Sequence, residues 1–430
     1  MLNHFYRLAL SHSSSLLSIG ARGLIVVAGF AIAYMIGSRL GAEALGTYAL
    51  VTQTAMFLSI VAVGGLDLSI VRHFPIVEGR RPYASRSVLR MFGAAFGICL
   101  VITVLVFLFG PAFFDLFDEV DASTSLLAIL SVIFISRAFT RATSAYLRSQ
   151  RLYVYSQVVE GLIIPIPVIA LLLLGMIDTV TEILLVTAVA GLVAVVIGIG
   201  SSLTRTSRDS RAAQVSLAPL YTMALPLWGV AIVKNFTDWY SLSVVGAQLS
   251  VAEAGQYRIA FQIASALPII AIGIFGVFSP QIASAAEDGK FHAAAKLART
   301  ATRLSLALAL PIVLALLAVS RPLLAFVGPE FVAAQPVLFV LIASQVAYLA
   351  AGPSGILLAL MGKQTINLAL SIAALAIFAV AIPLSAIHFG LIGVAAAITV
   401  VIVAQNVSQY LAVRWLLKID VWSGRYHGGK

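Results

Sequence analysis

The stretch from Val88 to Phe109 reads VLRMFGAAFGICLVITVLVFLF, and its one charged residue is Arg90. A helix that crosses a membrane needs about 20 mostly apolar residues, so this stretch is long and apolar enough to be one. Most of the chain consists of such stretches, separated by short charged joints. Of its 430 residues, 61% are hydrophobic and 10% are charged, against about 25% charged in soluble domains. The twelve predicted spans cover residues 16–36, 45–71, 88–109, 126–147, 153–174, 183–203, 217–242, 254–283, 304–319, 332–361, 366–387 and 391–417.

The spans predict an all-α polytopic membrane protein with about twelve transmembrane helices in contact with membrane lipid. The single cysteine, Cys99, lies inside an apolar stretch, and no cluster of cysteine and histidine indicates a metal site. We therefore expect neither a metal nor a cofactor. The sequence also lacks G-x-S-x-G, H-E-x-x-H and a phosphate loop, so we do not expect an enzyme.

Charge at the joints predicts the orientation. Joints that alternate along the chain hold 21 of the 27 basic residues, whereas the opposite joints hold only Arg39 and Arg321 beside nine acids. Basic residues concentrate on the cytoplasmic side of membrane proteins, so both termini are predicted to be cytoplasmic. The net charge of +10 thus reflects the joints, and we expect no nucleic-acid partner.

An internal repeat divides the predicted spans into two halves. The segment 46–55, GTYALVTQTA, aligns with 255–264, GQYRIAFQIA, at an offset of 209 residues. With six spans in each half, the two halves insert in the same orientation and form parallel repeats, with a pathway expected at their interface. The polar joint 204–216 separates an N-terminal six-helix lobe, residues 1–210, from a C-terminal six-helix lobe, residues 211–430.

Seven charged residues remain at membrane depth, where an ionised side chain costs about 2.5–3.5 kcal/mol on insertion scales. Arg22 and Lys234 occupy repeat-related spans 1 and 7, and Arg258 lies in span 8. We hypothesise that these cations line a central cavity that attracts a phosphorylated or otherwise anionic substrate. The membrane-depth residues are the cations Arg22, Arg137, Lys234 and Arg258 and the acids Asp67, Glu160 and Asp238.

Structural interpretations compete with these functional ones. Lys234 and Asp238 are one helical turn apart and can neutralise each other. Arg137 is interpreted as snorkelling to the interface, and Asp67 as pairing with nearby Arg72. Glu160 is isolated in the sequence, which makes it a candidate for H⁺ or Na⁺ coupling, with Asp238 and Asp67 as further candidates.

Two glutamines, Gln53 and Gln262, recur at matching places in the two halves. They can donate hydrogen bonds to sugar hydroxyls, or they can join helices to each other. The sequence leaves both interpretations open.

Several segments resemble the polysaccharide transporter flippases of the multidrug/oligosaccharidyl-lipid/polysaccharide exporter superfamily. They are 41–50, GAEALGTYAL; 253–260, EAGQYRIA; 321–331, RPLLAFVGPEF; and 390–397, GLIGVAAA. The resemblance implies two six-helix lobes that work by alternating access, and a substrate built on a polyprenyl diphosphate that carries an oligosaccharide for O-antigen, capsule or exopolysaccharide. It also implies coupling to an ion gradient. Arg22 and Arg258 fall in spans where related flippases carry arginines.

A multidrug antiporter of the same superfamily, coupled to H⁺ or Na⁺, is the alternative. That function predicts a cavity lined by carboxylates, whereas the cations at membrane depth outnumber the acids by four to three. A membrane polymerase or ligase would need a substantial outer loop with catalytic residues, and the longest outer loop, 110–125, is short. A purely structural scaffold leaves the cations at membrane depth unexplained.

Overall fold

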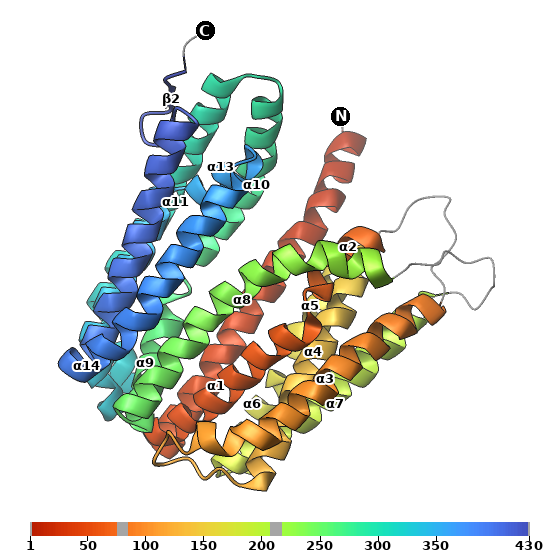
Figure 1. Cartoon of the computed structure of the whole chain (residues 1–430), viewed down its shortest axis with the longest axis vertical. Coiled ribbons are helices and arrows are strands. Elements are labelled where there is room, and N and C mark those ends of the chain that lie inside the picture. Colours follow the sequence, from red (N-terminus) through yellow and green to blue (C-terminus); the bar gives the residue numbers. More distant parts are fainter. Residues whose placement is uncertain (1, 75–84, 207–216, 429–430) are drawn as a thin grey trace. The chain divides into compact units, whose positions relative to one another are not determined.

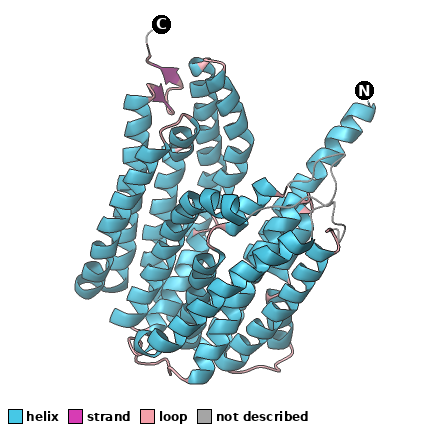
Figure 2. Cartoon of the chain, turned by 45° about the vertical axis from the view of Figure 1, so that its right-hand side comes forward, coloured by secondary structure: helices cyan, strands magenta, loops and turns pink. Residues whose placement is uncertain are grey.

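The computed structural model describes residues 2–74, 85–206 and 217–428, without the side chains of 2–19, 22, 72–73, 217–223, 225–227, 230 and 234. The described chain is helical throughout, apart from connections and one two-stranded hairpin (Figure 2). Its elements are α1 Leu2–Val63, α2 Leu66–His73, α3 Ser85–Phe114, α4 Thr124–Ser149, α5 Tyr153–Gln157, η1 Val158–Leu162, α6 Pro165–Leu173, α7 Val180–Leu203, α8 Leu217–Gln248, α9 Val251–Ala264, α10 Pro268–Glu287, α11 Phe291–Val327, η2 Pro329–Ala334, α12 Gln335–Ala351, α13 Ser354–Leu360, α14 Gln364–Leu416, β1 Ile419–Asp420 and β2 Arg425–Tyr426.

Two of the helices, α1 and α14, each contain two predicted spans joined at a single glycine. Gly41 in α1 has φ 88° and ψ 179°, and Gly390 in α14 has φ 60° and ψ −150°. A side chain with a Cβ is strained in these regions of backbone space, so glycine allows the sharp kink without a loop. The predicted spans already leave a joint at each place, 37–44 and 388–390, but hydropathy does not show that each joint is a kink rather than a loop.

The count of membrane-spanning helices agrees with the prediction once these kinks are considered. Among the described residues, eight helices are long and apolar enough to cross a membrane, and the bent pair Tyr153–Leu162 with Pro165–Leu173 raises this to nine. Both α1 and α14 hold two predicted spans, and α8 corresponds to a further one. The predicted all-α polytopic class is confirmed.

Contacts divide the chain into unit 1, Met1–Trp239, and unit 2, Tyr240–Lys430. In unit 1, α4 is the most buried span and packs against α1, α2, α3 and α7 (Figure 1). Two glycines of α7 allow the close approach of α4. A Cβ on Gly191 would lie 2.3 Å from Ser136 Oγ, and one on Gly198 would lie 2.6 Å from Thr143 Oγ1.

The division between the units falls inside α8, whereas the predicted lobe boundary precedes this helix. Two tryptophans of α8 explain its place in unit 1. Trp228 donates its indole N–H to the Ile60 carbonyl at 2.9 Å, and Trp239 donates to Thr54 Oγ1 at 3.0 Å. The Trp239 ring also lies between Phe57, at 4.9 Å, and Phe113, at 5.8 Å. These contacts fix α8 to α1 and α3.

Unit 2 is a bundle of α9 to α14 that ends in the hairpin β1–β2 (Figure 1). Two clusters of its buried side chains join these elements. One joins α10, α11 and α12 around Ala271, Phe275 and Leu349, and the other joins α10, α11, α13 and α14 to the hairpin through Ile419 and Val421. The hairpin was not predicted, because two strands of two residues are too short to leave a pattern.

Candidate functional site

The central cavity predicted around Arg22, Lys234 and Arg258 stays a prediction. The side chains of Arg22 and Lys234 lie outside the described residues, and so does the predicted neutralisation of Lys234 by Asp238. Arg258 lies in α9 and is partly buried. Asp238, in α8, is also partly buried.

The two repeat-related glutamines are likewise placed but not tested. Gln53 lies in α1 beyond the kink, and Gln262 lies near the end of α9. Both side chains are partly buried. Each therefore lies in the second predicted span of its half, as the repeat requires, and their role in binding sugar or joining helices stays open.

Asp67 forms an ion pair inside unit 1. Its carboxylate accepts a hydrogen bond from Arg141 Nη2 of α4 at 2.8 Å, and the exposed fractions of the two side chains are 10% and 18%. Arg72, the partner expected from the sequence, has no described side chain. Asp67 opens α2, so the pair joins this short helix to the middle of the bundle.

Glu160 is not isolated, which corrects the sequence interpretation. Its Oε2 accepts hydrogen bonds from Arg148 Nη1 at 2.7 Å and from Ser144 Oγ at 2.6 Å. Arg148 also donates to Ser144 Oγ at 3.0 Å. The sequence hides these contacts because Arg148 and Ser144 lie on α4, 12 and 16 residues before Glu160.

The backbone around Glu160 is irregular. Residues Val158–Leu162 form a π-helical turn, in which the Ile163 N–H donates to the Val158 carbonyl at 3.1 Å. Pro165 follows and has no N–H for a helical hydrogen bond. The helical segments Tyr153–Leu162 and Pro165–Leu173 are bent by 48° relative to each other. The turn packs closely on α1, since a Cβ on Gly161 would lie 2.3 Å from Ile25 Cδ1. Irregular turns of this kind are frequent at functional sites.

Arg137 lies near the middle of α4, twelve residues from its C-terminal end, which is about 18 Å of helix. This distance argues against the snorkelling expected from the sequence. The side chain is partly buried, and Tyr48, Glu160 and Arg141 are close enough to interact with it electrostatically. Among the described side chains, no carboxylate lies within ion-pair distance of its guanidinium.

The charged residues of α4 share one face. Arg137, Arg141 and Arg148 are separated by four and seven residues, spacings that return to the same side of a helix. Two carboxylates from other elements, Asp67 and Glu160, pair with two of these three arginines. This face of α4 therefore carries more positive than negative charge, and the arginine without an ion pair among the described side chains is Arg137. This spacing is readable from the sequence, but the partners are not.

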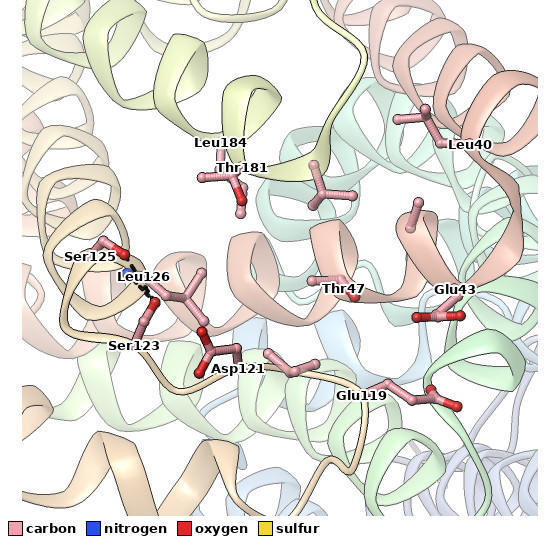
Figure 3. Close-up of a pocket in the computed structure, with 13 residues that line it drawn as sticks. Leu40, Glu43, Thr47, Glu119, Asp121, Ser123, Ser125, Leu126, Thr181 and Leu184 are labelled. Atoms are coloured by element: carbon pink, nitrogen blue, oxygen red, sulfur yellow. Dashed lines mark hydrogen bonds between the residues drawn. The ribbon is translucent and has the colours of Figure 1, made fainter.

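A pocket of about 370 Å³ lies in unit 1 beside the kink of α1 (Figure 3). The carboxylates of Glu43, Glu119 and Asp121 lie around it, together with hydroxyl groups (Figure 3). Ser123 caps α4 here by accepting the Leu126 N–H at 3.3 Å. Sequence reasoning placed the three acids in outer joints but could not bring Glu43 together with Glu119 and Asp121, because Glu43 follows the first span and the other two follow the third. The lining residues are Leu40, Glu43, Ala44, Thr47, Glu119, Val120, Asp121, Ser123, Ser125, Leu126, Val180, Thr181 and Leu184.

Metal binding finds no support in the described part of the chain. Within residues 2–74, 85–206 and 217–428, no group of three or more histidine, cysteine or acidic residues is arranged to hold an ion. The single cysteine, Cys99, is buried in α3.

The chain resembles solved transporters along nearly its whole length. It matches "Lipid II flippase MurJ, inward closed conformation" with a TM-score of 0.74 and 13% identity, over 93% of this chain and 87% of that chain. It matches "Inward-facing conformation of a multidrug resistance MATE family transporter of the MOP superfamily" with a TM-score of 0.72 and 14% identity, over 92% and 94%. For the MATE multidrug transporter DinF-BH the TM-score is 0.57 and the identity 18%, over 96% of each chain.

At these identities the likeness is one of fold. No curated protein sequence matches the chain. The sequence profile of the family described as "Polysaccharide biosynthesis protein" matches residues 35–332, which is more than half of the chain. The chain therefore belongs to this family of polysaccharide biosynthesis proteins, with the two-lobe fold of transporters of the MOP superfamily.

Proposed function

We propose that this protein is a flippase that moves a polyprenyl-diphosphate-linked oligosaccharide across the bacterial cytoplasmic membrane, for O-antigen, capsule or exopolysaccharide synthesis. Family membership supports a role in polysaccharide synthesis. The fold shared with a lipid II flippase supports the movement of a lipid-linked glycan. The alternating basic joints support cytoplasmic termini.

Arg137 carries the proposal. A guanidinium near the middle of a span is costly to keep there unless an anion or a wet cavity compensates for it. The neighbouring arginines of α4 already have carboxylate partners, and among the described side chains Arg137 has none within ion-pair distance. Arginine binds phosphate through a planar fork of N–H donors. A diphosphate substrate would supply the missing negative charge.

The other substrate-binding residues of the proposal are Arg22, Lys234 and Arg258 for the diphosphate, with Gln53 and Gln262 for the sugars. Glu160, Asp238 and Asp67 are the candidates for coupling to H⁺ or Na⁺. Of these, Glu160 combines an irregular turn with a partly exposed ion pair. A carboxylate whose partner can leave it is suited to exchange one cation for another.

Reconstituted protein tests the proposal directly. In proteoliposomes that contain fluorescent undecaprenyl-diphosphate-linked N-acetylglucosamine, a membrane-impermeant quencher reaches the probe of the outer leaflet at once and the probe of the inner leaflet only after it is flipped. We expect Arg137→Gln to reduce the flipping rate at least tenfold and Arg137→Lys to retain part of it, because lysine keeps the charge without the fork. Arg205→Gln, which removes an equal charge from an exposed position after α7, is the matched control and should flip at the wild-type rate.

Unchanged flipping by Arg137→Gln would contradict the role of this arginine. The accessibility of Cys99 to a thiol reagent shows whether a slow variant is folded, because this single cysteine is buried in α3 of the same unit. Failure of the wild-type protein to flip the diphosphate-linked probe would contradict the flippase assignment itself.

One observation favours the multidrug antiporter as a second candidate. The pocket beside the α1 kink is lined by Glu43, Glu119 and Asp121 and by no cation, which is the carboxylate lining that an organic cation needs. Deletion of the gene separates the two functions. An antiporter deletion raises drug susceptibility, whereas a flippase deletion accumulates a lipid-linked glycan without changing susceptibility.

A further inference from the structure

The residues that follow α14 fold back onto unit 2 as the hairpin β1–β2. Ile419 and Val421 are fully buried in the cluster with α10, α11, α13 and α14. Tyr426 stacks on Phe291 at the start of α11, with ring centroids 5.1 Å apart. The hairpin is therefore a fixed part of the bundle and holds its tip residues in place.

Three arginines from two helices meet at this hairpin. Arg303 of α11 donates a long hydrogen bond, 3.5 Å, to the Trp422 carbonyl. The backbone of Gly424 packs on Arg299 of α11, where an added Cβ would lie 2.8 Å from Cδ. Arg414, in the last turn of α14, interacts electrostatically with Asp420. We call Arg299, Arg303, Arg414 and Trp422 the hairpin patch.

Asp420 offsets one of the three positive charges and leaves the patch with a net positive charge. Burial alone would raise the pKa of Asp420, but N–H donors at Trp422 and Ser423, helped by the charge of Arg414, hold the pKa of that carboxyl below its ordinary value. Its Oδ1 accepts the Trp422 N–H at 2.8 Å and the Ser423 N–H at 3.2 Å. The carboxylate therefore stays ionised, held in the turn, and its single charge is smaller than the sum of the three arginine charges. Among the described residues, none of the three arginines forms an ion pair.

Aromatic rings are exposed beside these charges. The side chain of Trp422 is 42% exposed at the tip of the hairpin, and Trp415, in the last turn of α14, is 64% exposed. Indole rings exposed in this way are typical of the headgroup level of a bilayer, where the ring is apolar and its N–H can meet a polar group.

The length of α11 places the patch at that level. The helix has 37 residues, or about 55 Å at 1.5 Å per residue, whereas the hydrocarbon core is about 30 Å thick. Arg299 and Arg303 lie within its first 13 residues, before the apolar stretch 304–319. These first turns are therefore expected to extend beyond the hydrocarbon, at the level of the phosphate groups.

We propose that the hairpin patch binds the phosphate of an anionic phospholipid from the leaflet at this end of unit 2. The guanidinium groups supply the charge and the fork of donors that a phosphate prefers. The indole of Trp422 inserts beside the glycerol region and makes the site one for lipid rather than for a free anion. The site is independent of the transported substrate and of the direction of transport.

Brominated lipids test the proposal on the full-length protein in nanodiscs. Bromine on the acyl chains quenches indole fluorescence at short range, and comparison with Trp422→Phe isolates the contribution of Trp422. At equal mole fraction, we expect brominated phosphatidylglycerol to quench Trp422 more than brominated phosphatidylcholine. The double variant Arg299→Gln/Arg303→Gln should lose this preference, because each charge that is removed lowers the affinity for the anionic lipid about fivefold.

Two variants guard against trivial explanations. Arg303→Lys keeps a cation and should keep the preference, which shows that the double variant loses it through charge rather than through misfolding. Arg321→Gln removes an equal charge from the opposite end of α11 and should behave as the wild type. The proposal is overturned if both lipids quench Trp422 equally in the wild type, if Arg321→Gln loses the preference, or if inorganic phosphate abolishes it.

Discussion

Replacing Arg148 with glutamine leaves the Glu160 carboxylate with the Ser144 hydroxyl as its remaining hydrogen-bond donor among the described side chains. Hydrogen bonds to charged groups contribute about 1.5–3 kcal/mol. Both side chains are about one-third exposed, at 30% and 32%, so water screens part of the lost attraction. We therefore expect Arg148→Gln and Glu160→Gln each to destabilise unit 1 by about 1–2 kcal/mol. The double variant should lose less stability than the sum of the losses in the two single variants, because both partners of the pair are then absent.

The other two ion pairs of the described residues show how the cost of losing one partner should depend on burial. Asp67 and Arg141 are more buried, at 10% and 18%, so Asp67→Asn should cost about 3 kcal/mol, as for other buried pairs that lose one partner. Lys290 and Asp288 are joined at a similar distance, 2.9 Å, but are 68% and 53% exposed. Lys290→Gln should cost less than about 0.5 kcal/mol. The three costs should follow burial, not distance.

Thermal unfolding followed by helical circular dichroism measures all the variants in one detergent. For the pairs of unit 1, the reaction of Cys99 with a thiol reagent is a second measurement, because this single cysteine is fully buried. The reasoning is refuted if Lys290→Gln destabilises the protein as much as Arg148→Gln does. A cost for Asp67→Asn no larger than that for Glu160→Gln would refute it as well.

Two further predictions use thermal unfolding, and a third uses hydrogen exchange. Gly191→Ala should cost about 1–3 kcal/mol through overpacking, because its Cβ would lie 2.3 Å from Ser136 Oγ; Gly200→Ala, which meets nothing within 4 Å, is the control that should not destabilise. Gly390→Ala should cost about 1–3 kcal/mol because of φ 60° and ψ −150°, and an unchanged unfolding temperature would contradict this. The lowered pKa of Asp420 stabilises the hairpin fully above the ordinary aspartate pKa of about 3.9, and the stability is lost as pH falls through the lower folded value. Hydrogen exchange of the hairpin, corrected for the intrinsic effect of pH, should accelerate only in that acidic range.

Hydropathy predicts the helical class well, because the cost of exposing backbone to lipid forces each apolar stretch into a helix. The segments that begin at Gly46 and Gly255 both open the second span of their half, as the repeat predicts. Hydropathy places a joint between residues 36 and 45 but cannot show that it is a kink at Gly41 instead of a loop, since both forms interrupt an apolar stretch in the same way. The π-helical turn at Glu160 is hidden because it changes the direction of a helix without changing its composition.

Charge was harder to interpret than hydropathy. The inventory of residues at membrane depth found Glu160 and Arg137, but local spacing suggested that the first was isolated and that the second reached the interface. Both interpretations considered only neighbours in sequence, whereas the ion pairs of Glu160 and Asp67 join α4 to other elements. Arg148 and Arg141 were assigned to a joint by their sign, which concealed their role as partners.

The glycine at each kink has a mechanical consequence. A flexible loop between two spans would allow one helix to tilt while the next helix stayed in place. Residues Leu2–Val63 and Gln364–Leu416 instead continue through Gly41 and Gly390 as helix on both sides. Each pair of spans is thus joined through a single residue, and any change in the angle between the two helices has to occur at that glycine.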